Sequence, residues 1–181
     1  MFITLKEIED KYNINFSDDI NINEQQKEIL NIFNNKNELF EQYTHIELFN
    51  YNLCYIIGLY YKNIKKDYEL MKKYYLMAIE KGNSNTMNYL GVYYKNIEKD
   101  YDLMKKYYLM AIEKNNSNAM NNLGNYYEKI EKDYDLMKKY YLMAIEKGNN
   151  NAMYNLGFYY KNIKKDYDLM KKYYLMAIEK G

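Results

Sequence analysis

The sequence predicts an all-α protein: a right-handed α-solenoid of antiparallel helix pairs, with four repeats that follow an N-terminal helical cap. The main observation is a nearly identical block that recurs four times at a constant spacing of 33 residues, as stacked helix pairs do. The chain also has no proline, the residue that most strongly interrupts helices. Finally, its hydrophobic fraction of 48% is too high for a disordered chain.

Residues 1–49 are not repeated, and we expect them to cap the first repeat with short helices. The segments 5–12 and 23–33 have the pattern of helices, and 13–19 has that of a turn. The first ten residues carry charges where a signal peptide needs an apolar core. No stretch approaches the roughly 18 consecutive apolar residues of a membrane-spanning helix, so we expect no membrane partner.

Residues 50–181 read as four repeats, at about 50–82, 83–115, 116–148 and 149–181, each with a first helix (helix A) and a second (helix B). Helix A of the second repeat is predicted over about 85–97. Its apolar side follows the spacing of an amphipathic helix and consists of Met87, Leu90, Gly91, Tyr94 and Ile97.

Helix B of the second repeat is predicted over about 101–114. Asp100 precedes it as a helix N-cap, and Asn115 follows it where two other repeats have Gly82 and Gly148. An acidic start and a glycine or asparagine just past the end are typical of helix caps. Short connections between helices favour antiparallel neighbours.

A glycine inside every helix A should cost about 1 kcal/mol relative to alanine, so we expect a close helix approach there. The small residues expected to face these glycines are Ala78, Ala111, Ala144 and Ala177. The paired tyrosines of helix B are expected to pack in the core and at its rim. A tyrosine stripe that stacks on bases or ligand rings is the alternative.

The repeats resemble Sel-one-like repeats, a family close to tetratricopeptide repeats. The family's helix A pattern, Ala-x-x-x-Leu-Gly-x-x-Tyr, is met by Ala119, Leu123, Gly124 and Tyr127, and by Ala152, Leu156, Gly157 and Tyr160. The family's helix B pattern is met by Asp67, Tyr74, Tyr75, Ala78 and Gly82, with Tyr74 in place of a tryptophan. The resemblance covers residues 50–181.

Two departures from the family are visible. The stretch between Tyr127 and Asp133 is shorter than the family's Gly-x-Gly-Val loop, and Met71 and Ile79 replace small alanines. The resemblance implies a scaffold for protein–protein contacts without intrinsic catalysis. The amino-acid usage of the repeats is also similar to that of repeat proteins from giant DNA viruses of amoebae. This similarity implies a host or viral protein as the partner and the host cytoplasm as the location.

Helix B is almost invariant between repeats, whereas helix A varies at positions that share one face. In a solenoid this face lines the concave surface. We therefore expect a peptide or helical segment of a partner to bind there, with aromatic anchors at one end and amides in the middle. The alternative is a solvent-exposed face whose residues vary between the repeats without any role in binding. The predicted binding residues are Tyr55, Leu59, Asn88, Val92, Lys95, Asn121, Asn122, Asn125, Glu128, Tyr154, Phe158 and Lys161.

Nothing in the sequence predicts an enzyme, a cofactor or a metal site. The chain has one histidine, His45, and one cysteine, Cys54, and their separation does not favour a nucleophilic pair. Cys54 aligns with Met87, Met120 and Met153, so a buried, inert thiol is expected. A single cysteine fits a reducing compartment such as the cytoplasm.

The charge balance of 26 basic against 25 acidic residues gives no general attraction to nucleic acid. Lys106 and Lys139 are expected to pair with Asp102 and Asp135, four residues earlier. A helical-repeat protein that reads single-stranded RNA with helix A side chains is the alternative function.

The last repeat has no polar capping helix after it, so we expect an exposed apolar face at that end. Three explanations stay open: a longer array, self-association, or a covering partner.

Overall fold

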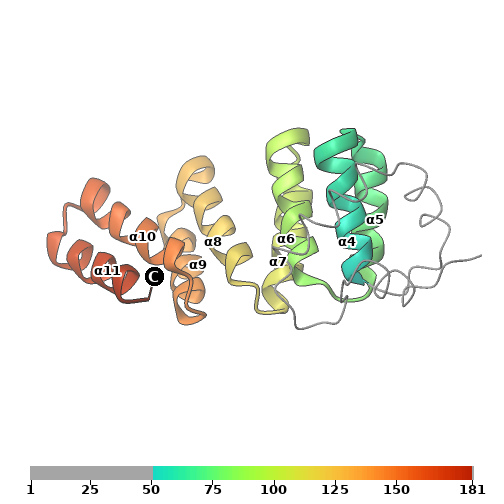
Figure 1. Ribbon diagram of the computed structural model, residues 1–181. Coiled ribbons are helices and arrows are strands. Elements are labelled where there is room, and N and C mark those ends of the chain that lie inside the picture. Colours follow the sequence, from blue (N-terminus) through green and yellow to red (C-terminus); the bar gives the residue numbers. More distant parts are fainter. Residues whose placement is uncertain (1–50, 181) are drawn as a thin grey trace, which may run out of the picture. The chain divides into compact units, whose positions relative to one another are not determined.

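The computed structural model describes residues 51–180, with side chains from Cys54 onward, and in this range every regular element is a helix (Figure 1). The predicted all-α solenoid fold is confirmed for this part of the chain. The predicted cap over 1–49, its boundary with the first repeat, and His45 lie outside the described residues. The chain divides into two compact units, 1–86 and 87–181, and the division falls inside the third described helix.

Each repeat contributes one A helix and one B helix, labelled as in Figure 1. The A helices are α4 (Tyr51–Tyr60), α6 (Ser84–Tyr93), α8 (Ser117–Tyr126) and α10 (Asn150–Tyr159). The B helices are α5 (Tyr68–Glu80), α7 (Tyr101–Glu113), α9 (Tyr134–Glu146) and α11 (Tyr167–Lys180).

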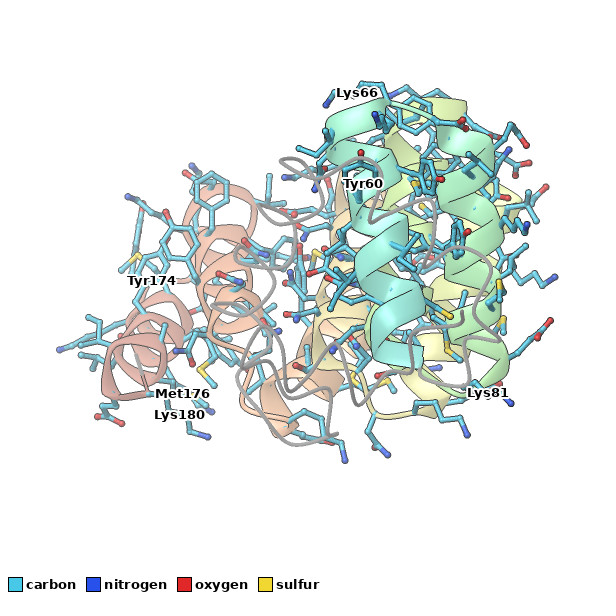
Figure 2. The ribbon with its side chains drawn as sticks, turned by 45° about the vertical axis from the view of Figure 1, so that its right-hand side comes forward. Tyr60, Lys66, Lys81, Tyr174, Met176 and Lys180 are labelled. Atoms are coloured by element: carbon cyan, nitrogen blue, oxygen red, sulfur yellow. The ribbon has the colours of Figure 1, made fainter. Side chains whose placement is uncertain are left out.

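In the first unit, α4 and α5 form an antiparallel pair. Lys66 follows the π-turn Tyr61–Lys65 that extends α4, and Lys81 follows α5; the two lie at opposite ends of the pair in Figure 2. The side chains of Ile57, Tyr60 and Tyr75 are fully buried. Apolar burial between the two helices therefore holds this repeat together.

In the second unit each helix packs against the next, so that α7 contacts α8, α8 contacts α9, α9 contacts α10 and α10 contacts α11. The pairs α8–α9 and α10–α11 run side by side in Figure 1. One apolar cluster links the last two repeats, built from Met120, Met137, Tyr141, Ala144, Ile145, Ala152, Met153, Leu156, Tyr159 and Tyr173.

The predicted helix caps are confirmed. The Asp100 carboxylate accepts hydrogen bonds from the backbone N–H groups of Asp102 (3.1 Å) and Leu103 (2.9 Å) at the start of α7. Asn115 has a φ of 60°, and Gly148 a φ of 77°, as the left-handed cap residue requires. Local cap chemistry thus determines where helix B begins and ends.

The end of helix A differs from the prediction. α6 stops at Tyr93 and continues as a π-helical turn, Tyr94–Glu98, and Lys99 then adopts a left-handed φ of 59°. Because a π-turn is wider than an α-turn, it rotates Ile97 outward, and this side chain is 51% exposed although the periodicity placed it in the core. The chain reverses over two residues, which accommodates the short repeat.

The close approach at the helix A glycines is confirmed, but the expected alanine partners are wrong. A Cβ built on Gly124 would lie 2.6 Å from the ring of Tyr141, and Gly91 meets Tyr108 in the same way. The glycine therefore makes room for a tyrosine ring of helix B, and the alanine at position 144 is instead buried in the core.

The other tyrosines form a ladder of ring contacts. Tyr94 stacks on Tyr107 at 5.5 Å with 1° between the ring planes, and Tyr127 stacks on Tyr140 at 5.6 Å with 3°. This confirms that the tyrosines serve packing, because the rings are occupied by one another.

Candidate binding face

Ten of the predicted binding residues lie in the second unit. Asn122 lies beside Asn121 on α8, and the other nine come three from each of three consecutive A helices with their π-turns. We call these nine residues the A-helix face: Asn88, Val92 and Lys95; Asn121, Asn125 and Glu128; Tyr154, Phe158 and Lys161. Within each helix they are four and three residues apart, which places them on one side. The last residue of each set lies in a π-turn.

The two predicted residues of the first unit are buried. Tyr55 stacks on Tyr75 with 6.1 Å between ring centroids, and Leu59 is also inside the first repeat. Neither side chain presents substantial surface in this structure. The accessible part of the predicted set therefore lies in residues 87–181.

The asparagines in the middle of the set form a ladder between consecutive A helices. The side-chain amide of Asn122 donates a 2.9 Å hydrogen bond to Asn88, and that of Asn155 donates a 2.9 Å bond to Asn121. Asn88 and Asn121 are buried. These bonds satisfy buried amides and hold neighbouring A helices in register.

The third repeat carries a second polar cluster around the buried Tyr141. Its hydroxyl lies 2.9 Å from Asn125 Oδ1 and 2.9 Å from Glu128 Oε2. Asn155 also donates to Asn125 at 3.4 Å, which joins this cluster to the ladder. Burial, with a smaller contribution from Glu128, raises the pKa of Tyr141, so the phenol stays protonated at neutral pH and can donate.

Accessibility on the A-helix face is greatest in the fourth repeat. Tyr154 is 55% exposed and Phe158 is 47% exposed, and Lys161 is also exposed. Tyr154 keeps a ring contact of 5.4 Å with Tyr174 of α11, which is labelled in Figure 2. Val92 and Asn125 are half-buried. The exposed aromatic rings are the anchors that such a face can offer a partner.

The face also carries three charged groups at one position of the repeat. Lys95 and Glu128 are half-buried, and no ion pair joins either of them, or Lys161, to another described residue. Burial, and then the neighbouring Lys129 and Lys99, lowers the pKa of Lys95. None of the three charges has an ion-pair partner among the described residues, so each is available to an opposite charge on a ligand.

The helix B lysines pair differently from the prediction. Lys105 lies 3.6 Å from Asp102 and Lys138 lies 2.9 Å from Asp135, so the partners are three residues apart and not four. Lys106 instead lies over the ring of Tyr107 at 5.5 Å. The tyrosine ladder competes for the second lysine of each pair through cation–π contacts.

Two of the site types considered from the sequence, a reactive cysteine and a metal cluster, can be examined in the described residues. Cys54 is buried, and burial raises the pKa of its thiol to about 11, which leaves it a poor nucleophile at neutral pH. No group of three or more histidine, cysteine, aspartate or glutamate side chains gathers as a metal site between 51 and 180. In the same range no helix is both long and apolar enough to cross a membrane.

The asparagine ladder and the tyrosine–glutamate cluster were not predicted. A signal for the ladder exists in the sequence, because Asn88 and Asn122, and likewise Asn121 and Asn155, are one repeat plus one residue apart. A stagger of one residue lets side chains on neighbouring A helices meet. A comparison of identical repeat positions alone does not find such pairs.

Known structures support the Sel1-like character of the repeats. A Sel1 repeat protein from Oxalobacter formigenes is similar with a TM-score of 0.63 and 27% identity, over 84% of this chain and 70% of its own length. An immunity protein from Pseudomonas aeruginosa shares the fold with a TM-score of 0.53 and 18% identity, over 72% of this chain, which spans 59% of that protein's length. No family model and no curated protein matches the sequence.

Proposed function

We propose that the chain is a non-catalytic protein-interaction scaffold that binds a peptide or a helical segment of a protein partner on the A-helix face of its second, third and fourth repeats. In a solenoid of helix pairs this face belongs to the concave side. The similarity to a Sel1 repeat protein supports the scaffold class, and the face itself is argued from this chain's own residues.

The observation that carries the proposal is the separation of shared from individual positions. The glycine that every repeat keeps in helix A, and the leucine before it (isoleucine in the first repeat), are buried, as at Leu123 and Gly124. The positions that differ between repeats include the exposed Tyr154 and Phe158. Packing accounts for the first group and does not require the second, so the second group is free to be selected for contact with a partner.

The asparagines of the face take two different roles in this proposal. Asn88 and Asn121 are buried and bonded to neighbouring A helices, so they fix the spacing of the face. Asn125 and Glu128 stay half-buried, and Asn125 accepts a 3.4 Å hydrogen bond from Asn155 of the fourth repeat. A partner would thus meet an apolar anchor beside a preorganised polar strip, the arrangement of energetically effective interfaces.

The test is capture of partners from a lysate with the intact chain and with two triple variants. Tyr154→Ala, Phe158→Ala and Lys161→Ala together remove the accessible end of the face. Leu109→Ala, Leu142→Ala and Leu175→Ala remove three exposed leucines of helix B and are the matched control. We expect a protein that the face variant loses and that the control retains, with or without ribonuclease.

Two results would contradict the proposal. If the face variant retains every protein that the intact chain binds, the face is solvated surface. If the captured species is RNA, or proteins that disappear with ribonuclease, the helical-repeat RNA-binding function replaces the scaffold.

The proposal includes a cytoplasmic location, because the single cysteine fits a reducing compartment. It also includes a host or viral protein as the partner if the gene is viral, as the similar amino-acid usage of viral repeat proteins suggests. Fractionation of cells that express the tagged chain tests the location.

A further inference from the structure

The three unpaired charges of the A-helix face alternate in sign along consecutive repeats. Lys95, Glu128 and Lys161 occupy one position at intervals of 33 residues, in the π-turns that follow α6, α8 and α10. Within the described residues no acidic group pairs with either lysine and no basic group pairs with the glutamate. A ligand that neutralises all three must therefore carry the pattern negative, positive, negative.

Glu128 is the unusual member of this set. It lies in the last turn of its helix, where the partial negative charge of the helix end disfavours a carboxylate and favours the lysine found at 95 and 161. The Tyr141 hydroxyl nevertheless holds Glu128 Oε2 at 2.9 Å, and Asn125 shares that hydroxyl at 2.9 Å. A carboxylate in an unfavourable place, held in one orientation, is typical of a functional group.

The spacing of the three charges fits an extended polypeptide. The bonds between Asn88 and Asn122 and between Asn121 and Asn155 place consecutive A helices side by side. Packed helices lie about 8–10 Å apart. An extended chain in the polyproline II conformation rises about 3.1 Å per residue with three residues per turn, so every third side chain lies on the same side, about 9 Å further along, and meets the next repeat.

We propose that the A-helix face recognises an extended peptide that places a lysine or arginine on Glu128 and an aspartate or glutamate three residues away on each side, on Lys95 and Lys161. This inference rests on the proposed function and names the chemistry of its partner. An aromatic or aliphatic side chain next to the acid at Lys161 packs on Phe158. Because the pattern is symmetric, either direction of the peptide satisfies it.

The same charges disfavour a nucleic acid on this face. A phosphate backbone presents negative charge at every nucleotide, and it would place phosphates beside the Glu128 carboxylate. Repulsion from Glu128 would oppose the attraction of the two lysines. The alternation thus favours a peptide of mixed charge.

The test uses nine-residue synthetic peptides with serine at the unspecified positions, tyrosine at positions 3 and 7, and a fluorescent label at the amino end. The acid–base–acid peptide has glutamate at positions 2 and 8 and lysine at position 5. The base–acid–base peptide reverses all three charges, and the all-acid peptide has glutamate at all three positions. Fluorescence anisotropy measures the affinity of the full chain for each.

Three variants of the full chain accompany the wild type. Glu128→Gln removes the charge and keeps an acceptor for Tyr141, and Glu128→Lys reverses the charge. Glu146→Lys makes the same change in net charge at an exposed residue of helix B and is the matched control. Circular dichroism and urea unfolding verify that each variant is folded.

We expect the wild type to bind the acid–base–acid peptide about tenfold or more tighter than the base–acid–base peptide, since close charge pairs couple strongly. Glu128→Lys should lose this preference and gain affinity for the all-acid peptide, Glu128→Gln should be intermediate, and Glu146→Lys should behave as the wild type. Equal affinity of the wild type for the acid–base–acid and base–acid–base peptides, or equal effects of Glu128→Lys and Glu146→Lys, would overturn the inference.

Competition separates this inference from the proposed function. If a protein captured through Tyr154 and Phe158 is not displaced by the acid–base–acid peptide, the charge pattern is wrong and the scaffold function stands. If no captured protein depends on those two residues, both the proposed scaffold function and the charge pattern that rests on it are wrong.

Discussion

At the scale of the residue, Gly124 illustrates how packing overrides helix propensity. Alanine is the better helix former by about 1 kcal/mol, yet a Cβ at this position would lie 2.6 Å from the Tyr141 ring. We expect Gly124→Ala to lower the free energy of unfolding by about 1–3 kcal/mol, as overpacking does. Urea unfolding measures it, with Glu146→Ala at an exposed position of α9 as the control. A Gly124→Ala protein as stable as the wild type would contradict the close approach.

At Lys132 we expect the introduction of glycine to stabilise the protein, because the backbone there is left-handed. Its φ of 59° is a conformation that costs an L-residue with a side chain about 1–2 kcal/mol and costs glycine almost nothing. Lys132→Gly should therefore raise the free energy of unfolding by up to about 1 kcal/mol, after the greater entropy of glycine in the unfolded chain is subtracted. Lys139→Gly, inside α9, should lower it. If both substitutions change stability in the same direction, the strain at Lys132 is not real.

At the scale of the element, the sequence predicts what local chemistry decides. The Asp100 cap and the Asn115 C-cap follow from side-chain and backbone preferences that act over three or four residues. The π-turn after Tyr93 does not, because it depends on how the end of helix A packs against helix B. The partner of Gly124 was missed for another reason. The repeats keep both Ala144 and Tyr141, so comparison between them cannot decide which one faces the glycine.

Two isoleucines, one in α9 and one in α11, show that the same local sequence can be buried in one repeat and exposed in another. Ile145 and Ile178 stand in the same local sequence, yet Ile145 is 9% exposed within the core cluster and Ile178 is 74% exposed. We expect Ile145→Ala to cost about 2 kcal/mol or more, as buried truncations do, and Ile178→Ala to stay within about 0.5 kcal/mol. Thermal or urea unfolding of the two variants measures the difference. Equal losses would show that a further contact covers Ile178 in solution.

At the scale of the whole molecule, the many buried phenols connect stability to alkaline pH. Burial, and then Tyr61 and Cys54, raises the pKa of Tyr74 to about 12, and burial raises the pKa of Tyr108 and Tyr141 as well. Because these values lie above the pKa of about 10 in an unfolded chain, the stability they contribute is complete below pH 10. It is lost as the pH rises through the folded values.

We therefore expect the free energy of unfolding to fall between about pH 10 and pH 12. Urea titrations at several pH values measure this fall, and tyrosinate absorbance distinguishes the phenols from the lysines that titrate in the same range. Ionisation of every tyrosine near pH 10 in a protein that stays folded would rule out this source of stability.

The candidate site was predictable to a limited depth. Comparison of the repeats identifies the variable positions of helix A, because framework positions are kept by packing in every copy. It does not separate Asn121, which is buried in the ladder, from Phe158, which is exposed. That distinction depends on how neighbouring A helices are staggered, and the stagger is a property of packed repeats. The orientation of Glu128 by Tyr141 likewise appears only once the two helices are placed side by side.

The most direct test of the account is photo-crosslinking in cells from two positions of similar exposure. A benzophenone-bearing amino acid replaces either Phe158, 47% exposed on the A-helix face, or Leu142, 41% exposed on helix B. If the A-helix face binds a protein, position 158 gives a defined protein adduct that is resistant to ribonuclease, and position 142 gives none. Equal adducts from both positions, or an adduct to RNA from position 158, would contradict a protein-binding A-helix face.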